Sequence, residues 1–242
     1  MSATLLHVDA VTKRFGGFTA VDAISIAISP GERFGLIGPN GSGKTTLINC
    51  ISGALRNDTG SIIFDGQDVT GLPAYKRTRA GIARSFQIPR PFKSMTVLEN
   101  LLVAIDLAAI GHGLSVRDQE ASALGILQRM GLAAKAKTAS SQLSQVELRK
   151  MELARAMAAR PKLLISDEAM AGLSESEIDE VLALLMALNA DGITIIMIEH
   201  IMHAVMRFSA RVVCLDAGRI ICEGTPGEVM ANARVQEAYL GS

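Results

Sequence analysis

The residues best suited to chemistry lie in one glycine-rich segment, Gly38 to Thr45, which fits the pattern G-x-x-x-x-G-K-[ST] at every fixed position. Glycines let the backbone fold tightly and turn successive N–H groups toward an anion. A following helix adds the positive end of its dipole. In this chemistry Lys44 reaches the β- and γ-phosphates of a nucleotide, and the Thr45 hydroxyl binds Mg²⁺. The segment predicts an ATP site; the alternative is a strand-to-helix turn that binds no ligand.

This phosphate loop has the local context that its pattern requires. Arg33 to Ile37 is a short apolar stretch that predicts a strand directly before the loop. Lys44 to Ser52 has helical character, and Gly53 is placed to end that helix. The predicted nucleotide-binding residues of the segment are Gly38, Pro39, Asn40, Gly41, Ser42, Gly43, Lys44, Thr45 and Thr46.

A second apolar stretch ends in two acidic residues. Leu163 to Ser166 predicts a strand that places Asp167 and Glu168 at the carboxyl edge of a sheet, beside the phosphate loop. Asp167 would hold Mg²⁺ through water, and Glu168 would polarise the water that attacks the nucleotide. Many strands end in acids, so this pattern gains its meaning from the phosphate loop upstream.

Two more polar residues follow predicted strands of the same sheet. His200 comes after the apolar stretch Ile193 to Ile198 and could reach a γ-phosphate, although a lone histidine is more often structural or solvated. Gln87 follows the stretch Ile82 to Phe86, and a glutamine after a strand carries almost no information by itself. Both residues therefore depend on the rest of the constellation for their interpretation.

The elements that position these residues change character along the chain. Leu5 to Val11 and Val21 to Ile28 predict two strands joined by a turn at Gly16-Gly17. From Val97 to about Ala158 the pattern is mostly helical. After that, strand and helix alternate, which is typical of a largely parallel sheet covered by helices. We expect an α/β fold with an antiparallel N-terminal β-layer and a helical insert.

Composition sets broader limits. Lysine plus arginine equals aspartate plus glutamate at 24 each, so we expect no general attraction to nucleic acid or to an anionic membrane. The three cysteines have no metal-ligand spacing, which favours small buried thiols in a reduced, cytosolic chain. The N-terminus lacks a secretory-signal layout, and every apolar stretch is far shorter than the roughly 20 residues that span a bilayer. We expect a soluble chain whose membrane role comes through partners.

In this order of elements the chain resembles the ATPase subunits of ABC transporters, over essentially its whole length. The resemblance implies a P-loop NTPase core, with ATP and Mg²⁺ as ligands. It implies one nucleotide-binding domain over residues 1–242, with a helical subdomain inserted at about 88–158. The functional residues that it implies are Lys44, Glu168 and His200 for catalysis and Thr45, Gln87 and Asp167 for Mg²⁺.

Other positions take their roles only from this resemblance. Phe15 is matched to the aromatic residue that stacks on adenine, whereas a phenylalanine on a strand is otherwise more often a core residue. Gln87 is matched to the residue that senses Mg²⁺ and the membrane subunits. The segment Ala171 to Ser174 lies where the family has a loop that contacts the second ATPase of a dimer. Docking onto a permease is expected in a groove near Gln87 to Asn100.

Within that family the chain is most similar to the branched-chain amino acid importer subunits, although importers for urea, amides or other polar amino acids could share the same segments. The implied partners are a second ATPase subunit, two transmembrane permease subunits and, indirectly, a solute-binding protein, at the cytoplasmic face of the membrane. The segments that carry this similarity are Arg14 to Gly17, Arg84 to Gln87, Met95 to Leu101, Met170 to Leu173, Ile198 to His200 and Ala238 to Gly241.

The clearest departure from the family lies in its Leu-Ser-Gly-Gly-Gln signature, which here reads Leu-Ser-Gln-Val-Glu from Leu143 to Glu147. Ser144 keeps a hydroxyl for the ATP held by the other subunit. Val146 brings a branched side chain where close backbone approach suits glycine. Glu147 adds a negative charge; at about 5 Å from a phosphate charge, repulsion could reach roughly 3 kcal/mol at an effective dielectric of about 20.

This departure leaves several functions open. A homodimer would carry the altered signature in both of its sites and should hydrolyse ATP weakly, which favours a heterodimer with an intact partner. One hypothesis is the ATPase subunit of an importer. A second is a nucleotide-gated regulatory subunit with little hydrolysis of its own. A third, an ATPase acting on DNA or ribosomes, is opposed by the neutral charge and the absence of a coiled coil or second cassette.

Overall fold

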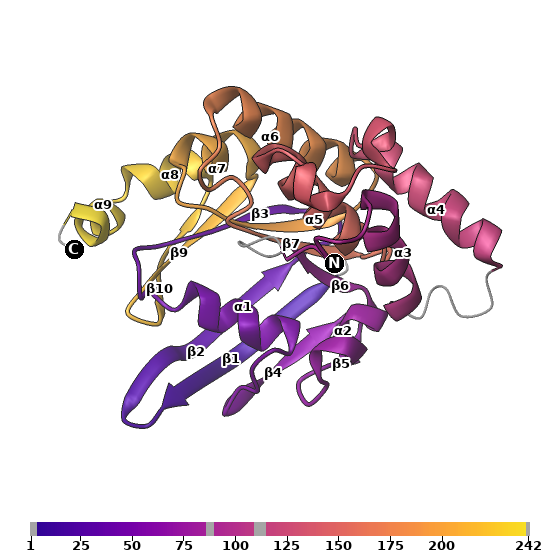
Figure 1. Cartoon of the computed structure of the whole chain (residues 1–242). Coiled ribbons are helices and arrows are strands. Elements are labelled where there is room, and N and C mark those ends of the chain that lie inside the picture. The colour runs from indigo at the N-terminus through magenta and orange to yellow at the C-terminus, as the bar shows by residue number, and fades with distance from the viewer. Residues whose placement is uncertain (1–3, 86–89, 109–114, 241–242) are drawn as a thin grey trace.

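A computed structural model of the chain describes residues 4–85, 90–108 and 115–240. Its first sheet is antiparallel, with the strand order β2-β1-β4-β5 (Figure 1). The predicted turn at Gly16-Gly17 is confirmed, because Phe15 pairs with Phe18 across it. The strands of this sheet are β1 (Leu6–Phe15), β2 (Phe18–Ile28), β4 (Thr59–Phe64) and β5 (Gln67–Asp68).

The second sheet is the mostly parallel one that the sequence predicts. Its strand order is β10-β9-β3-β8-β7-β6, and among the described strands of this sheet only the edge strand β10 pairs in an antiparallel sense. This arrangement confirms the expected α/β fold class. The strands are β3 (Arg33–Ile37), β6 (Ile82–Ser85), β7 (Leu163–Asp167), β8 (Thr194–Ile198), β9 (Arg211–Asp216) and β10 (Arg219–Gly224).

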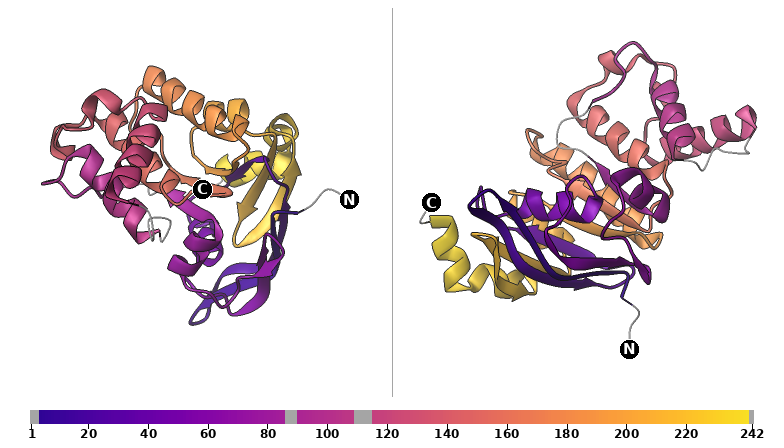
Figure 2. Two further views of the ribbon diagram at one scale, coloured as in Figure 1. Left: turned by 90° about the vertical axis from the view of Figure 1, so that its right-hand side faces the viewer. Right: turned by 90° about the horizontal axis from the view of Figure 1, so that it is seen from below.

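Helices surround this sheet. Figure 2 places α3, α4 and α5 together at one end of the molecule, with α8 and α9 at the other end. A short 3-10 turn, Ser140–Gln142, interrupts the stretch from Val97 to about Ala158 that was predicted to be mostly helical. The helices are α1 (Lys44–Ser52), α2 (Ala74–Ala80), α3 (Val97–Leu107), α4 (Val116–Arg129), α5 (Gln145–Met157), α6 (Glu175–Ala190), α7 (Met202–Phe208), α8 (Pro226–Ala231) and α9 (Ala233–Leu240).

Serine or threonine followed three residues later by glutamate starts several of these helices. At α3, for example, the Thr96 side chain accepts from the backbone N–H of Glu99, while the Glu99 carboxylate accepts from Thr96. The same capping box begins α5, α6 and α8. Each box satisfies donors that the first turn of a helix would otherwise leave without partners.

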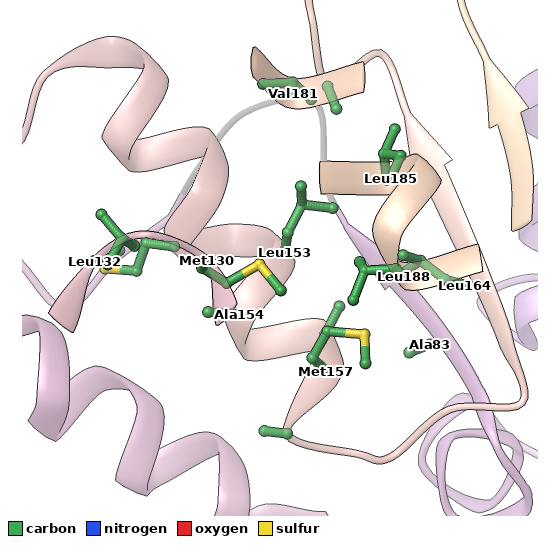
Figure 3. Packing of buried hydrophobic residues seen from close by; sticks show 14 of the residues in the cluster. Ala83, Met130, Leu132, Leu153, Ala154, Met157, Leu164, Val181, Leu185 and Leu188 are labelled. Carbon is green, nitrogen blue, oxygen red and sulfur yellow. The ribbon is translucent and has the colours of Figure 1, made fainter. Parts of the chain in front are cut away.

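Two large apolar clusters hold the layers together. One joins the first sheet and α1 to the central strands, so that Leu47 and Ile51 of α1 lie among side chains from both sheets. The other joins α3, α4 and α5 to β7, β8 and α6. Figure 3 shows Leu153 and Met157 of α5 beside Leu188 of α6 in this second cluster. Burial of these side chains therefore fixes the helical end against the sheet edge that carries the acidic residues.

The cysteines follow their predicted placement with one exception. Cys50 and Cys214 are buried, whereas Cys222 is only half-buried because β10 is an edge strand with a neighbour on one side. None of the described helices is long and apolar enough to cross a membrane.

Candidate functional site

The phosphate loop leaves β3 at the centre of the parallel sheet, between β8 and β9. Two of its glycines are required by close packing. A Cβ on Gly38 would lie 2.2 Å from the carbonyl oxygen of Leu215, and one on Gly43 would lie 2.4 Å from that of Ala20. Gly43 also has a φ of +103°, which L side chains rarely adopt. The loop can therefore hold this shape only with glycine at both positions.

Lys44 points back into the arc of this loop. Its ammonium donates hydrogen bonds to the carbonyl oxygens of Gly38 at 2.6 Å and Pro39 at 3.0 Å, and lies 3.5 Å from Ser42 Oγ. The side chain is buried, and burial lowers the pKa of Lys44 while the negative charge of Glu168 opposes that shift. Within the described part of the chain, the hydrogen bonds of this buried cation go to neutral groups of the loop, so the cation is well suited to an anionic ligand.

The start of α1 has the properties of an anion site. Among the described residues no side chain caps this helix, and its first turn holds no acidic residue. Its N–H groups and the positive end of its dipole are therefore free to meet phosphate oxygens. Asn40, Gly41 and Thr45 are exposed, Pro39, Gly43 and Thr46 are half-buried, and Ser42 is buried.

Mg²⁺ would have few protein ligands at this site. Within the described ranges, no group of three or more His, Cys, Asp or Glu residues could hold a metal ion. Thr45 at the start of α1 and Asp167 at the end of β7 nevertheless both line one groove. Mg²⁺ keeps several waters and binds through one or two protein oxygens together with substrate phosphates, and this sparse oxygen set fits that habit.

Asp167 is held by a cation that the sequence reasoning did not single out. Arg84 Nη2 lies 2.5 Å from Asp167 Oδ2, and Arg84 Nε lies 3.2 Å from the same oxygen. Arg84 Nη1 also donates to Asn49 Oδ1 of α1 at 2.6 Å. Arg84 thus ties β7 to the helix of the phosphate loop. The sequence feature that could have identified Arg84 is its position on β6, because β6 lies beside β7 and side chains of neighbouring strands can form ion pairs.

Glu168 and His200 meet at the ends of neighbouring strands. His200 Nε2 lies 3.0 Å from Glu168 Oε1. Glu168 has a φ of +47°, and its N–H donates to the carbonyl oxygen of Ile198 at 2.9 Å. A left-handed conformation in a non-glycine residue costs free energy and is found preferentially at functional sites. The two residues therefore share the sheet edge that faces the phosphate loop.

Glu199, beside His200, is buried where His200 is exposed. Its Oε1 accepts a hydrogen bond from the backbone N–H of Met170 at 3.0 Å. Burial raises the pKa of Glu199 to about 7, and the Glu168 charge adds to the rise, while the Met170 hydrogen bond opposes it. In the sequence, Glu199 was noted only as part of the segment Ile198 to His200. It joins the end of β8 to the loop that follows Glu168.

The altered signature segment begins α5 as a capping box. Ser144 Oγ accepts from the N–H of Glu147 at 3.3 Å, and Glu147 Oε2 accepts from the N–H of Ser144 at 2.9 Å. Glu147 Oε1 also lies 3.4 Å from Lys135 Nζ. These contacts lower the pKa of Glu147, the Ser144 bond most of all. The negative charge is therefore partly balanced within this chain, which weakens the expected repulsion of a phosphate.

Val146 has a packing role in the same turn. It is half-buried and packs against the apolar cluster of α3, α4 and α5. Further along α5, Arg149 Nη2 donates to the carbonyl oxygen of Ala171 at 3.1 Å. The helix that begins with the signature thus also supports the loop from Ala171 to Ser174, in which Gly172 and Ser174 are exposed.

The other predicted contacts have different outcomes. Phe15 is 48% exposed at the end of β1, so the alternative of a core phenylalanine is wrong and its ring is accessible to a planar ligand. Lys13 Nζ lies 5.6 Å from the centroid of that ring. Gln87 lies outside the described residues.

A groove of about 810 Å³ lies between the sheet edge and the helical end of the molecule. Its lining extends from Thr45, Asp167 and Glu168 to residues of α2, α3 and α5. Near α5 its wall is charged, because Arg155 Nη1 contacts Glu152 Oε1 at 2.8 Å. Arg155 also holds the segment before α3, donating to the carbonyl oxygen of Arg90 at 3.0 Å. The groove connects the acidic residues to an exposed surface.

Comparisons with known proteins place this constellation in one family. A family model described as ABC transporter matches residues 21–171, and one described as branched-chain amino acid ATP-binding cassette transporter matches 219–242. The chain is 37% identical to the Pseudomonas aeruginosa high-affinity branched-chain amino acid transport ATP-binding protein BraF, covering 100% of this chain and 99% of that one. It is 39% identical to the Escherichia coli K12 protein LivG, of the same description, with the same coverage.

Solved structures agree with these sequences. The ADP conformation of MJ1267, an ATP-binding cassette of an ABC transporter, matches with a TM-score of 0.89 and 32% identity over 99% of this chain and 100% of that one. A second match, cbiO1 from Clostridium perfringens, has a TM-score of 0.85 and 27% identity over 98% and 95% of the two chains. These comparisons do not favour a regulatory subunit or an importer of urea or amides.

Proposed function

Because this chain belongs to the ABC transporter family of ATP-binding proteins, we propose that it binds and hydrolyses ATP to power an importer of branched-chain or related amino acids. The observation that carries the proposal is the convergence of Lys44, Glu168 and His200 at one sheet edge, with Glu168 and His200 3.0 Å apart. The identity of the transported solute is taken from the descriptions of the relatives.

Binding of ATP is assigned to the loop and to Phe15. The exposed Phe15 ring offers a stacking surface for adenine, and the N–H groups at the start of α1 donate hydrogen bonds to phosphate oxygens. Lys44 would exchange its bonds to the Gly38 and Pro39 carbonyls for bonds to phosphate. That exchange replaces neutral partners with anionic ones, and charge-assisted hydrogen bonds are roughly twice as strong as neutral ones.

Hydrolysis is assigned to Glu168 and His200. Glu168 accepts a proton from the attacking water, and His200 holds the carboxylate and the γ-phosphate in their relative positions. Thr45 and Asp167 would hold Mg²⁺, Asp167 through water. When bound, Mg²⁺ neutralises charge that develops on the phosphate oxygens. Gln87 keeps its predicted role as a Mg²⁺ contact.

The partner that completes the site is a second ATPase subunit. Ser144 would face the ATP held by that subunit, and the segment Ala171 to Ser174 would contact it. A heterodimer is favoured because Val146 occupies the turn where close backbone approach suits glycine. The balanced charge of Glu147 makes the defect smaller than the sequence implies, so some hydrolysis in a homodimer is expected.

The groove of 810 Å³ is the proposed seat of a permease subunit. It adjoins the segment from residue 90 to Asn100, within the stretch where docking was expected. Asn100, which is fully buried, holds this segment in place by accepting from the N–H of Phe92 at 2.8 Å. Through such permeases the chain would lie at the cytoplasmic face of the membrane, and a solute-binding protein would act on it only indirectly.

The test is hydrolysis measured with and without the partner. The purified chain is titrated with ATP, and phosphate release is then followed for this chain alone and for this chain mixed with a second ATPase subunit whose signature is intact. The proposal expects binding in both cases and faster release with the partner. Absence of ATP binding would overturn the proposed function, and brisk hydrolysis that the partner leaves unchanged would overturn the heterodimer.

A further inference from the structure

The last helix of the chain contacts the first residue of the phosphate loop. The backbone N–H of Gly38 donates a hydrogen bond of 2.8 Å to the hydroxyl oxygen of Tyr239, 201 positions away in the sequence. Tyr239 lies on α9, within the C-terminal segment matched by the branched-chain amino acid cassette model. The ABC transporter model ends before this segment, at residue 171. The contact therefore links a residue matched by the ABC transporter model to one matched by the branched-chain amino acid cassette model.

The need for this bond follows from where β3 ends. Ile37 is the last residue of β3 that pairs with β9, so the N–H of Gly38 lies beyond the ladder. Gly38 is buried, and a buried donor without a partner is unfavourable. Tyr239 supplies the missing acceptor. Burial raises the pKa of Tyr239 to about 12, so its hydroxyl remains neutral at physiological pH.

The bond bears directly on Lys44. The carbonyl oxygen of Gly38 accepts the shortest of the Lys44 hydrogen bonds, at 2.6 Å. Gly38 is therefore held through its N–H by α9 and through its carbonyl by the catalytic lysine. The other end of the loop is held separately, since the N–H of Gly218 donates to the carbonyl oxygen of Ser42 at 3.0 Å. Segments from outside the loop thus hold it at both ends, Tyr239 through its side chain and Gly218 through its backbone.

The ring of Tyr239 is positioned by packing. It lies against a small apolar cluster that includes Ile37 of β3, Cys214 of β9 and Val235 of α9. Val235, at 1% exposure, fixes α9 on this cluster without contributing a polar atom. The hydroxyl and the packing of α9 can therefore be removed separately.

We infer that Tyr239 is a positioning residue, whose hydroxyl holds the phosphate loop in the shape that receives nucleotide, so that α9 sets the nucleotide affinity. The inference rests on the proposed ATP binding and adds a residue outside the motifs. A loop that is already ordered loses less conformational freedom on binding phosphate. Without the hydroxyl, the loop must be ordered by the ligand itself.

The test uses Tyr239→Phe, which keeps the ring and removes the acceptor, with Val235→Ala as the control for loosened packing. Binding of Mg²⁺-ADP is measured by calorimetry, because ADP is not turned over. Amide hydrogen exchange at Gly38 is measured without nucleotide. We expect Tyr239→Phe to bind ADP about threefold to tenfold more weakly, the effect of losing one neutral hydrogen bond. Exchange at Gly38 should become faster, and Val235→Ala should change both less.

Three outcomes would overturn the inference. Tyr239→Phe could match the wild-type protein in both measurements, or it could speed amide exchange at Gly38 without weakening the binding of ADP. Alternatively, Val235→Ala could produce the same changes as Tyr239→Phe. Failure of the wild-type protein to bind ADP is a different result, because it would contradict the proposed function and not the role of Tyr239.

Discussion

His200 Nε2 lies 3.0 Å from Glu168 Oε1, although 32 positions separate the two residues. Each follows a strand of the parallel sheet, and β7 and β8 are neighbours whose register pairs Asp167 with Ile198. The contact is thus set by strand order, which brings a carboxylate beside an imidazole. Both residues follow strands other than β3, which leads into the phosphate loop. Substitutions at Glu168 or His200 can therefore be made without changing the loop itself.

Glu168→Gln should abolish most hydrolysis while retaining nucleotide binding. A general base contributes roughly 100-fold to 10,000-fold to such reactions, so phosphate release should fall by about 100-fold or more. Phosphate release and ATP titration measure the two effects, and size-exclusion chromatography should show more ATP-held dimer. The matched control is Glu120→Gln, which changes an exposed carboxylate on α4. Hydrolysis at the wild-type rate in Glu168→Gln would remove Glu168 from catalysis.

Glu199 predicts a pH dependence of stability. Its pKa is about 7 in the folded protein against an ordinary value of 4.5, so between these values the folded state binds a proton that the unfolded state releases. The contribution of Glu199 to the free energy of unfolding is therefore fully present at low pH and is lost as the pH rises through 7. The complete loss amounts to about 3 kcal/mol. Glu199→Gln keeps an acceptor for Met170 and should remove this decline.

The measurement is urea unfolding of both proteins at pH 5.5 and 8. The wild-type protein should lose stability relative to Glu199→Gln between these two values. Glu120→Gln should follow the wild-type protein, because that carboxylate is exposed. An equal pH slope in Glu199→Gln and the wild-type protein would show that Glu199 does not bind the extra proton.

Arg84 should contribute to stability through Asp167. Arg84→Met leaves a carboxylate whose side chain is only 11% exposed without its cation, and breaking one side of such a pair costs about 3 kcal/mol or more. Adding Asp167→Asn to the Arg84→Met protein should recover part of the lost free energy of unfolding. Urea unfolding of the wild-type protein, the two single variants and the double variant measures this recovery. Arg117→Met on α4, where the arginine is exposed, is the control. Additive effects of the two single changes would mean that the pair is not coupled.

The signature predicts a gain of activity. Val146→Gly removes the branched side chain where the backbone would approach a phosphate, and Glu147→Gln removes a negative charge. In the combined variant the glutamine can still form the capping box. Hydrolysis by the chain alone should rise about tenfold, which needs only 1.4 kcal/mol at the transition state. Steady-state phosphate release measures the change, and Ser144→Ala in the same background should reverse it. An unchanged rate would show that the signature does not limit the homodimer.

The sequence alone predicts the elements around the candidate site well where a motif fixes both residue type and neighbouring element. The helix from Lys44 to Ser52 has the predicted bounds, and the strand predicted from Leu163 to Ser166 is one residue longer and ends at Asp167. Strong apolar patterns and glycines at required turns explain this agreement. Most of the parallel sheet was visible for the same reason.

The missed residues depend on contacts between distant segments. Arg84 reaches Asp167 across 83 positions, and Tyr239 reaches Gly38 across 201. Neither has a local pattern, because each acts through one side chain placed by the sheet. The small elements β5, β10, α2, α8 and α9 were also missed, since they are short and only weakly patterned. The sequence also did not reveal the capping box of Ser144 and Glu147, because Ser144 was interpreted only as a phosphate contact.

The position of β3 in the sheet has a consequence for biosynthesis. β3 emerges early from the ribosome, yet its two neighbours, β8 and β9, are made from residues 194–216 in the last quarter of the chain. A nascent chain that already contains Gly38 to Thr45 therefore still lacks both strands that flank β3. We expect the phosphate loop to take its final shape only after residues 194–216 have been made, so that a fragment released earlier would not bind ATP.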